Sequence, residues 1–255
     1  MKERPLQTNI IYGPVSSRRL GRSLGINILP TEKKVCTFDC LYCQYGWTGC
    51  RYDREILEKT ELPSVEQVKA ELEPALAGAE KIDVITLAGN GEPTLHPQFA
   101  DIARATAGLR DKLRQGVPVC ILSNSSTLDL PQVREGLKFV DRKVMKLDAG
   151  TQKLFLTINR PVASLKIETV VEHLSGMAGV EIQSLFFEGT LTNADQASIA
   201  SWLKVLERIG PSAVQVYSLD RTPADSSLRP VERNRLEEIA RAVRQSLPQA
   251  EVRVF

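Results

Sequence analysis

Three of the five cysteines lie close together in the chain, as Cys36-x3-Cys40-x2-Cys43. Thiolates bind soft metal centres such as zinc, copper(I) and iron–sulfur clusters. A structural zinc site needs four ligands. Cys50, seven residues on, could supply the fourth. No second cysteine pair follows and both histidines are distant in sequence, which weighs against zinc. Three cysteines alone would leave one iron of a four-iron cluster open to an outside ligand. The spacing indicates a metal centre and favours the cluster over zinc.

Short apolar runs alternate with helical patterns along the chain, which predicts βαβ units and a parallel sheet. The expected strands span 25–29, 82–88, 117–123, 143–147, 180–187, 213–219 and, at the end, 251–255. The expected helices span 64–76, 97–114, 195–209 and 231–247. Six units are found, and the last two of a closed barrel are not. The predicted fold class is therefore α/β, an open, partial (β/α)6 barrel.

The composition excludes several classes of protein. A net charge of +2 and 42% hydrophobic residues are unlike a disordered tail. No apolar run approaches the ~20 residues of a membrane-spanning helix, and we expect no secretory signal at the start. Few cysteines suit a reducing compartment, so we expect a cytoplasmic protein.

Basic residues are concentrated near the start, since residues 1–35 hold seven Lys and Arg against two acidic residues. We expect a basic arm at 1–23, the barrel core at 24–230, and a helix with a possible terminal strand of the same domain at 231–255. Arg18, Arg19 and Arg22 are expected before the first strand, where they could cover the barrel mouth and bind an anionic substrate or a reductant protein. The alternative is a solvated loop.

Polar side chains follow several expected strands, where ligands bind in such folds. Glu92 follows such a strand and could face the ligand site, or favour the helix that follows. Ser123 and Asn124 could contact a ligand or cap a turn. Lys146 and Asp148 are two residues apart on a strand and so point the same way; they contact a ligand or pair with each other.

Several motifs together resemble the radical S-adenosylmethionine superfamily. The cysteine spacing, with Tyr42 before the last cysteine, is the first. Gly89-Asn90-Gly91-Glu92-Pro93 resembles that superfamily's Gly-Gly-Glu-Pro motif, with Asn90 in place of the first glycine. Residues 121–125, 146–150 and 158–161 resemble its third- and fourth-strand regions, and residues 12–21 resemble a compact subgroup of single-cluster iron–sulfur oxidoreductases. The resemblance covers roughly residues 10–220.

The resemblance implies that Cys36, Cys40 and Cys43 hold a [4Fe-4S] cluster whose open iron binds S-adenosylmethionine. Reductive cleavage then gives a 5′-deoxyadenosyl radical, which abstracts hydrogen from a substrate, with electrons from a donor such as flavodoxin or ferredoxin. Glu92 would accept the methionine ammonium. The other residues expected at the cofactor are Tyr42 near the adenine, Asn90, Gly91, Ser123, Asn124, Lys146, Asp148 and Gln183.

Other functions stay open. Within the superfamily, the substrate could be RNA, as in tRNA modification of the wyosine type, or a protein, as for a glycyl-radical-enzyme activase. A different class is a zinc-stabilised binding module without catalysis, dependent on Cys50. In an enzyme, Cys50 could be a catalytic thiol, since Arg51 beside it could lower its pKa. A last alternative is a non-catalytic paralogue marked by Asn90.

Overall fold

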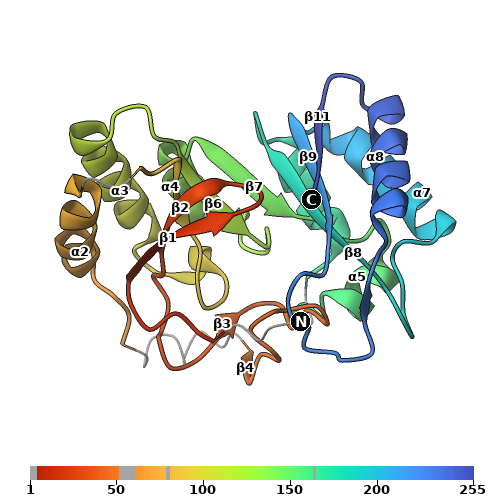
Figure 1. Ribbon diagram of the computed structural model, residues 1–255, viewed down its shortest axis with the longest axis horizontal. Helices are drawn as coiled ribbons and strands as arrows, with labels where there is room; N and C mark the ends of the chain where they lie inside the picture. Colours follow the sequence, from red (N-terminus) through yellow and green to blue (C-terminus); the bar gives the residue numbers. More distant parts are fainter. Residues whose placement is uncertain (1–4, 52–60, 79–80, 163–164) are drawn as a thin grey trace. The chain divides into compact units, whose positions relative to one another are not determined.

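The computed structural model describes residues 5–51, 61–78, 81–162 and 165–255 (Figure 1). They form two compact units. The Glu92 unit comprises Leu6–Thr37 and Gly49–Lys143, and the Asp148 unit is built mainly from Phe38–Thr48 and Val144–Phe255. Within the described part of the chain, no helix is long and apolar enough to cross a membrane.

The Glu92 unit contains a sheet whose strands lie in the order β1 (Ile11–Ser17), β2 (Gly21–Ile26), β5 (Val84–Leu87) and β6 (Val119–Ser123). β1 is antiparallel to β2, and the other pairs are parallel. Strands β3 (Val35–Cys36) and β4 (Cys50–Arg51) form a separate parallel pair. The helices are α2 (Val65–Ala77), α3 (Phe99–Leu113) and α4 (Pro131–Gly136), with 3-10 turns η1 (Pro93–Leu95) and η2 (Leu137–Phe139).

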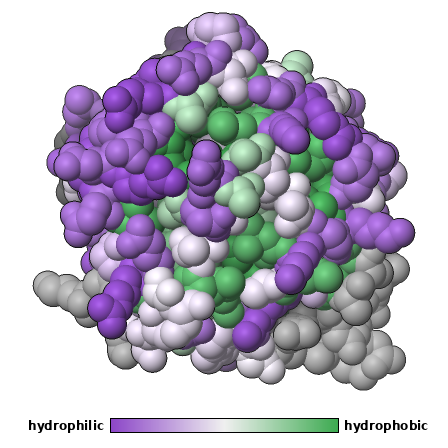
Figure 2. Space-filling view, turned by 90° about the vertical axis from the view of Figure 1, so that its right-hand side faces the viewer, coloured by the Kyte–Doolittle hydropathy of each residue, from purple (hydrophilic) through white to green (hydrophobic). Residues whose placement is uncertain are grey.

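The Asp148 unit is also α/β. Parallel strands lie in the order β7 (Arg142–Lys146), β8 (Glu181–Glu188), β9 (Ala213–Ser218) and β11 (Glu251–Val254), and the short β10 (Arg229–Pro230) pairs antiparallel with β8. The helices are α5 (Gln152–Ile158), α6 (Ile167–Ser175), α7 (Gln196–Ile209) and α8 (Arg233–Ser246). The face that carries α7 and α8 shows hydrophobic side chains among hydrophilic ones (Figure 2). A groove of about 260 Å³ lies there, lined by both helices.

Local chemistry explains where several elements begin and end. Ser64 caps α2 in a capping box, accepting from the Gln67 backbone N–H while the Gln67 side chain accepts from the backbone N–H of Ser64. Asp195 caps α7, which ends at Gly210 in a left-handed conformation. All four residues of β5 are buried, as expected of a parallel strand covered on both faces.

The predicted alternation of strands and helices is confirmed, but the start of the chain was predicted wrongly. The strand expected at 25–29 is β2, which begins at Gly21 and ends at Ile26. The segment expected as an arm contributes β1 to the sheet. The terminal strand is present as β11, beside β9, and the domain boundaries themselves stay a prediction.

Candidate active site

The loop that contains Cys40 and Cys43 is held by backbone hydrogen bonds. The N–H groups of Asp39 and Leu41 donate to the carbonyls of Asn159 and Ile158, each at 3.0 Å. These two bonds fix the chain on both sides of Cys40. Burial raises the pKa of the Cys40 thiol to about 11, against hydrogen bonds from Tyr42 and Asn159 that lower it, so a metal centre bound there would displace a proton.

The start of the cysteine segment is held in the Glu92 unit. The Val35 N–H donates to the Asn90 carbonyl at 2.9 Å, and the Glu92 N–H donates to the Val35 carbonyl at 3.1 Å. Gly91 lies between these two bonds with φ +138°, and a Cβ there would lie 1.7 Å from the Val35 carbonyl oxygen. Gly91 therefore allows a close backbone approach, as predicted, but to the residue before Cys36.

The Asn90 side chain is occupied by the chain itself. Its Oδ1 accepts from the Gln7 N–H at 2.8 Å, and its Nδ2 donates to the carbonyls of Gln7 and Pro30 at 2.9 and 2.8 Å. Asn90 is fully buried. Its amide binds the segment before β1 and Pro30, four residues after β2, so the side chain is engaged within the protein. The expected contact of Asn90 with the cofactor stays a prediction.

The Glu92 carboxylate is buried at the carboxyl end of β5. Oε1 accepts from the Thr94 N–H and hydroxyl at 3.1 and 2.6 Å and from the Ser123 hydroxyl at 2.9 Å, and Oε2 accepts from the Asn124 N–H at 2.6 Å. Burial raises its pKa, although these bonds oppose the shift. Within the described part of the chain, no Lys or Arg forms an ion pair with Glu92, so its charge would be stabilised by a bound cation.

Ser123 and Asn124 donate hydrogen bonds to the Glu92 carboxylate, and Asn124 also contacts the sulfur of a cysteine. The Asn124 Nδ2 donates to the Cys36 sulfur at 3.5 Å and to the Thr37 hydroxyl at 2.9 Å, while its Oδ1 accepts from the Ser126 N–H at 3.0 Å. Both side chains also accept from the backbone N–H two residues further on, as the turn alternative predicts. The ligand contact stays a prediction. Their side chains are engaged within the protein.

Lys146 and Asp148 pair with each other, as one of the two alternatives predicted. Lys146 Nζ lies 2.7 Å from Asp148 Oδ1 and donates to the Tyr217 hydroxyl at 2.9 Å. Asp148 Oδ1 also accepts from the Leu185 N–H at 2.8 Å, and Oδ2 accepts from the Tyr42 hydroxyl. Burial and the neighbouring Asp148 charge raise the pKa of Tyr42 well above its ordinary value, so Tyr42 stays a neutral donor.

Asn159 joins this carboxylate to a cysteine, and the candidate residues chosen from the sequence did not include it. Its Nδ2 lies 2.9 Å from Asp148 Oδ2, 3.0 Å from the Tyr42 hydroxyl and 3.5 Å from the Cys40 sulfur. More than a hundred residues separate Asn159 from Cys40. No local pattern indicates such a contact, although residues 158–161 belong to a motif already noted.

Gln183 extends the network away from the cysteine loop. Its Nε2 donates to Gln215 Oε1 at 2.9 Å, and its Oε1 accepts from the Tyr217 hydroxyl at 3.3 Å. Gln215 in turn donates to Glu181 at 3.2 Å. The Gln183 side chain thus has hydrogen-bond partners inside the sheet. A ribose contact is not needed to satisfy its polar atoms.

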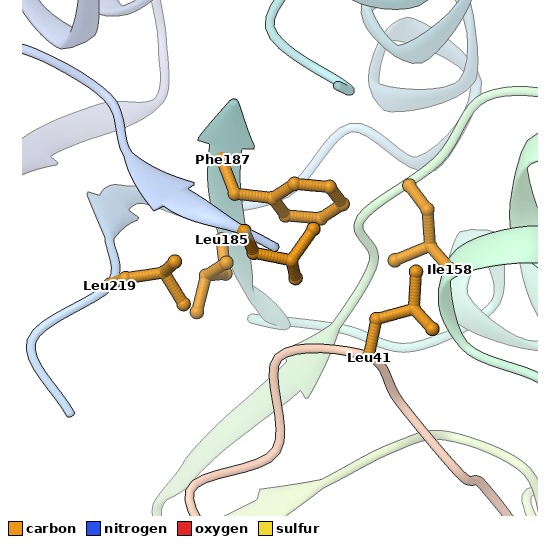
Figure 3. Close-up of a cluster of buried hydrophobic side chains, with 6 residues drawn as sticks. Leu41, Ile158, Leu185, Phe187 and Leu219 are labelled. Atoms are coloured by element: carbon orange, nitrogen blue, oxygen red, sulfur yellow. The ribbon is translucent and has the colours of Figure 1, made fainter. Parts of the chain in front are cut away.

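An apolar cluster packs against Tyr42. Leu41 and Ile158 point toward Leu185, Phe187 and Leu219 (Figure 3), and Leu228 completes the cluster. Tyr42 and Tyr217 pack against it with their rings. Tyr42 is therefore both a partly buried aromatic packed on the apolar cluster and a hydrogen-bond donor to Asp148.

The three arginines do not lie where they were expected. Arg18 and Arg19 are in the turn between β1 and β2, and Arg22 is the second residue of β2. The Arg22 Nε donates to the Lys81 carbonyl at 2.8 Å, ahead of β5. All three are at the amino ends of the parallel strands, whereas Glu92 follows a carboxyl end. The Cys50 side chain lies outside the described residues, so its predicted role as ligand or catalytic thiol stays a prediction.

Comparison with known proteins identifies the family. A family model described as "Radical SAM superfamily" matches residues 34–175. The chain is 31% identical over 230 residues to a "GTPase Obg" of Brachyspira hyodysenteriae, covering 88% of this chain and 32% of that protein. It is 30% identical over 227 residues to "UPF0026 protein MJ1312" of Methanocaldococcus jannaschii, covering 87% of this chain and 67% of that protein. The chain thus spans about a third of the first relative.

Solved structures share the fold. A radical SAM methyltransferase from Sphaerobacter thermophilus superposes with a TM-score of 0.63 at 12% identity, covering 91% of this chain and 65% of that one. The predicted partial barrel of the radical SAM type is confirmed. The chain belongs to the Radical SAM superfamily.

Proposed function

We propose that this chain is an enzyme that binds a [4Fe-4S] cluster through Cys36, Cys40 and Cys43, and S-adenosylmethionine beside it. When bound, the cluster supplies one electron to the sulfonium, which breaks a carbon–sulfur bond and gives a 5′-deoxyadenosyl radical. The buried carboxylate of Glu92 carries the proposal, because it forms no ion pair with a Lys or Arg among the described residues and an amino acid ammonium would supply that cation.

The residues present fit the cluster. Three thiols within eight residues are a donor set suited to iron–sulfur chemistry. All three residues are half-buried. Amide N–H groups already point at Cys36 and Cys40, as expected around metal-binding sulfurs.

Glu92 is prepared to hold an ammonium. Four hydrogen bonds orient its carboxylate, and Oε2 has only one of them, so it keeps capacity for a further donor. A charge-assisted hydrogen bond there would be worth about 1.5–3 kcal/mol. The residue also caps the 3-10 turn η1, which was the competing interpretation, so the carboxylate serves both purposes.

The remaining cofactor assignments stay predictions. Tyr42 near the adenine is compatible with a ring held by Asp148 and the apolar cluster. The predicted electron donor, flavodoxin or ferredoxin, and an RNA or protein substrate are carried by the resemblance alone. The arginine argument for RNA is weakened, since those side chains lie at the amino ends of the strands.

The test is anaerobic reconstitution followed by iron and sulfide analysis. We expect about four of each per chain, and 5′-deoxyadenosine on reduction with dithionite in the presence of S-adenosylmethionine. Replacing all three cysteines with Ala should abolish both. Cys120→Ala is the matched control, because Cys120 is buried in β6 and lies outside the loop. A colourless wild-type protein with a single zinc would refute the proposal.

A further inference from the structure

Two asparagine side chains donate to two of the three cysteine sulfurs, one within each unit. Asn124 reaches Cys36 in the Glu92 unit, and Asn159 reaches Cys40 in the Asp148 unit, both with an Nδ2–Sγ distance of 3.5 Å. Within the described part of the chain, no side-chain hydrogen bond reaches the sulfur of Cys43. Asn124 follows strand β6 and Asn159 follows helix α5, so this pairing is not a property of one loop.

The orientation of the Asn124 amide is fixed by its neighbours. Oδ1 accepts from the Ser126 N–H, and the two Nδ2 hydrogens have two acceptors, the Cys36 sulfur and the Thr37 hydroxyl. A reversed amide would set Nδ2 against the Ser126 donor. The N–H group is therefore held toward the sulfur by contacts that do not involve the sulfur.

The orientation of the Asn159 amide leaves one of its buried polar atoms without a hydrogen bond. Its Nδ2 faces Cys40, the Tyr42 hydroxyl and Asp148, whereas its buried Oδ1 has no hydrogen-bond partner. Reversing the amide would place its oxygen against the Asp148 carboxylate. An unsatisfied buried polar atom calls for an explanation, and here it is the consequence of directing both N–H hydrogens at anionic or sulfur acceptors.

We propose that Asn124 and Asn159 are positioning residues that set the reduction potential of the cluster, an inference that rests on the proposed function. Hydrogen bonds to ligating sulfurs tune the potential of an iron–sulfur cluster. Reduction adds one electron and makes the sulfurs stronger acceptors. An N–H donor therefore stabilises the reduced state more than the oxidised state, and each amide raises the potential.

The two asparagines also differ in the other groups that they contact. Asn124 donates its backbone N–H to Glu92, so it links the Cys36 sulfur to the predicted ammonium site. Asn159 shares its amide with Asp148 and Tyr42. In Asn124 only the side-chain amide contacts a sulfur, so its replacement isolates that contact from the backbone bond to Glu92. The Asn159 backbone carbonyl also accepts from the Cys40 sulfur at 3.7 Å, and a side-chain replacement leaves that carbonyl in place.

The test measures midpoint potentials by dithionite titration of reconstituted protein without S-adenosylmethionine, followed by electron paramagnetic resonance. Asn124→Leu and Asn159→Leu should each lower the reduced-to-oxidised ratio at a fixed potential about ten-fold, which is about 59 mV for one electron. Asn124→Asp and Asn159→Asp keep the side-chain shape and should shift the potential in the same direction. Loss of cluster iron to a chelator should be about ten-fold faster in the Leu variants.

Two control variants change neighbouring side chains without altering a sulfur donor. Thr37→Ser keeps the hydroxyl that accepts from the Asn124 amide and removes only the methyl group. Asn193→Leu removes a buried amide that donates to the carbonyls of Asp148 and Leu185. Both should keep the wild-type potential, even where they lower stability.

The outcomes separate the inference from the proposed function. A wild-type protein that assembles no four-iron cluster overturns both. A wild-type cluster with potentials unchanged in all four Asn124 and Asn159 variants overturns the inference alone, as does an equal shift in the two controls. A negative shift confined to the asparagine variants supports it.

Discussion

Replacing Asp148 with Leu should strongly destabilise the iron-free protein. The Asp148 side chain is fully buried, its partner Lys146 is 16% exposed, and their charged atoms are 2.7 Å apart. Removing one member of a buried ion pair leaves the other charge uncompensated, at a cost of about 3–5 kcal/mol. For a chain of this size, that is a fall in melting temperature of about 10 °C.

The stability lost in Asp148→Leu should depend on pH, because the charge of Lys146 depends on pH. Burial lowers the pKa of this ammonium, but attraction to Asp148 and contact with Tyr217 outweigh it and raise the pKa. The ring of Tyr42 also faces the ammonium, at 4.8 Å. In the wild type, this contribution is present at neutral pH and is lost as the pH rises through the raised pKa. In Asp148→Leu, burial dominates and lowers the pKa, so the variant gains stability with rising pH.

Urea unfolding of anaerobic, iron-free protein between pH 7 and pH 10 measures both effects. We expect the difference in unfolding free energy between wild type and variant to narrow as the pH rises. The double variant Lys146→Met/Asp148→Leu should recover much of the loss, since neither charge is left unpaired. A single variant that loses less than about 1 kcal/mol, or a double variant no more stable than the single, would refute the reasoning.

Three further substitutions test the Glu92 unit. Gly91→Ala should lower iron retention on reconstitution and lower the unfolding free energy by at least about 1–3 kcal/mol, because φ +138° is strained for any side chain and its Cβ would collide with the Val35 carbonyl; normal iron content and stability would contradict this. Glu92→Gln should weaken S-adenosylmethionine binding about ten- to a hundred-fold by calorimetry while leaving the iron content unchanged, and wild-type affinity would remove the ammonium assignment. Asn90→Leu should cost about 1–3 kcal/mol in urea unfolding and speed hydrogen exchange at Gln7, whose N–H donates to Asn90; unaltered exchange there would show that the amide fastens nothing.

Elements set by local chemistry were predictable from the sequence. The helix expected at 64–76 is α2, because Ser64 and Gln67 form a capping box from residues three apart. Parallel strands such as β5 and β9 are uniform apolar runs and were found close to their bounds. β1 was missed, because Gly13 and Pro14 interrupt its pattern and read as a turn.

The candidate site was predictable in its residue types but not in its contacts. Glu92 and the three cysteines follow from spacing and resemblance. Asn90 was expected at the cofactor, yet its amide binds the backbone of Gln7, 83 residues away. Asn159 contacts Cys40 over 119 residues. Such pairings depend on how the chain folds back on itself, which neither periodicity nor spacing records.

The close approach of Gly91 to Val35 has a consequence for sequence variation among relatives. The two hydrogen bonds that hold Val35 involve only main-chain atoms, so position 35 can exchange one aliphatic side chain for another without altering them. Position 91 has no such latitude, because every other amino acid adds the carbon that collides. We therefore expect relatives to vary among aliphatic residues at position 35 and to keep glycine at position 91.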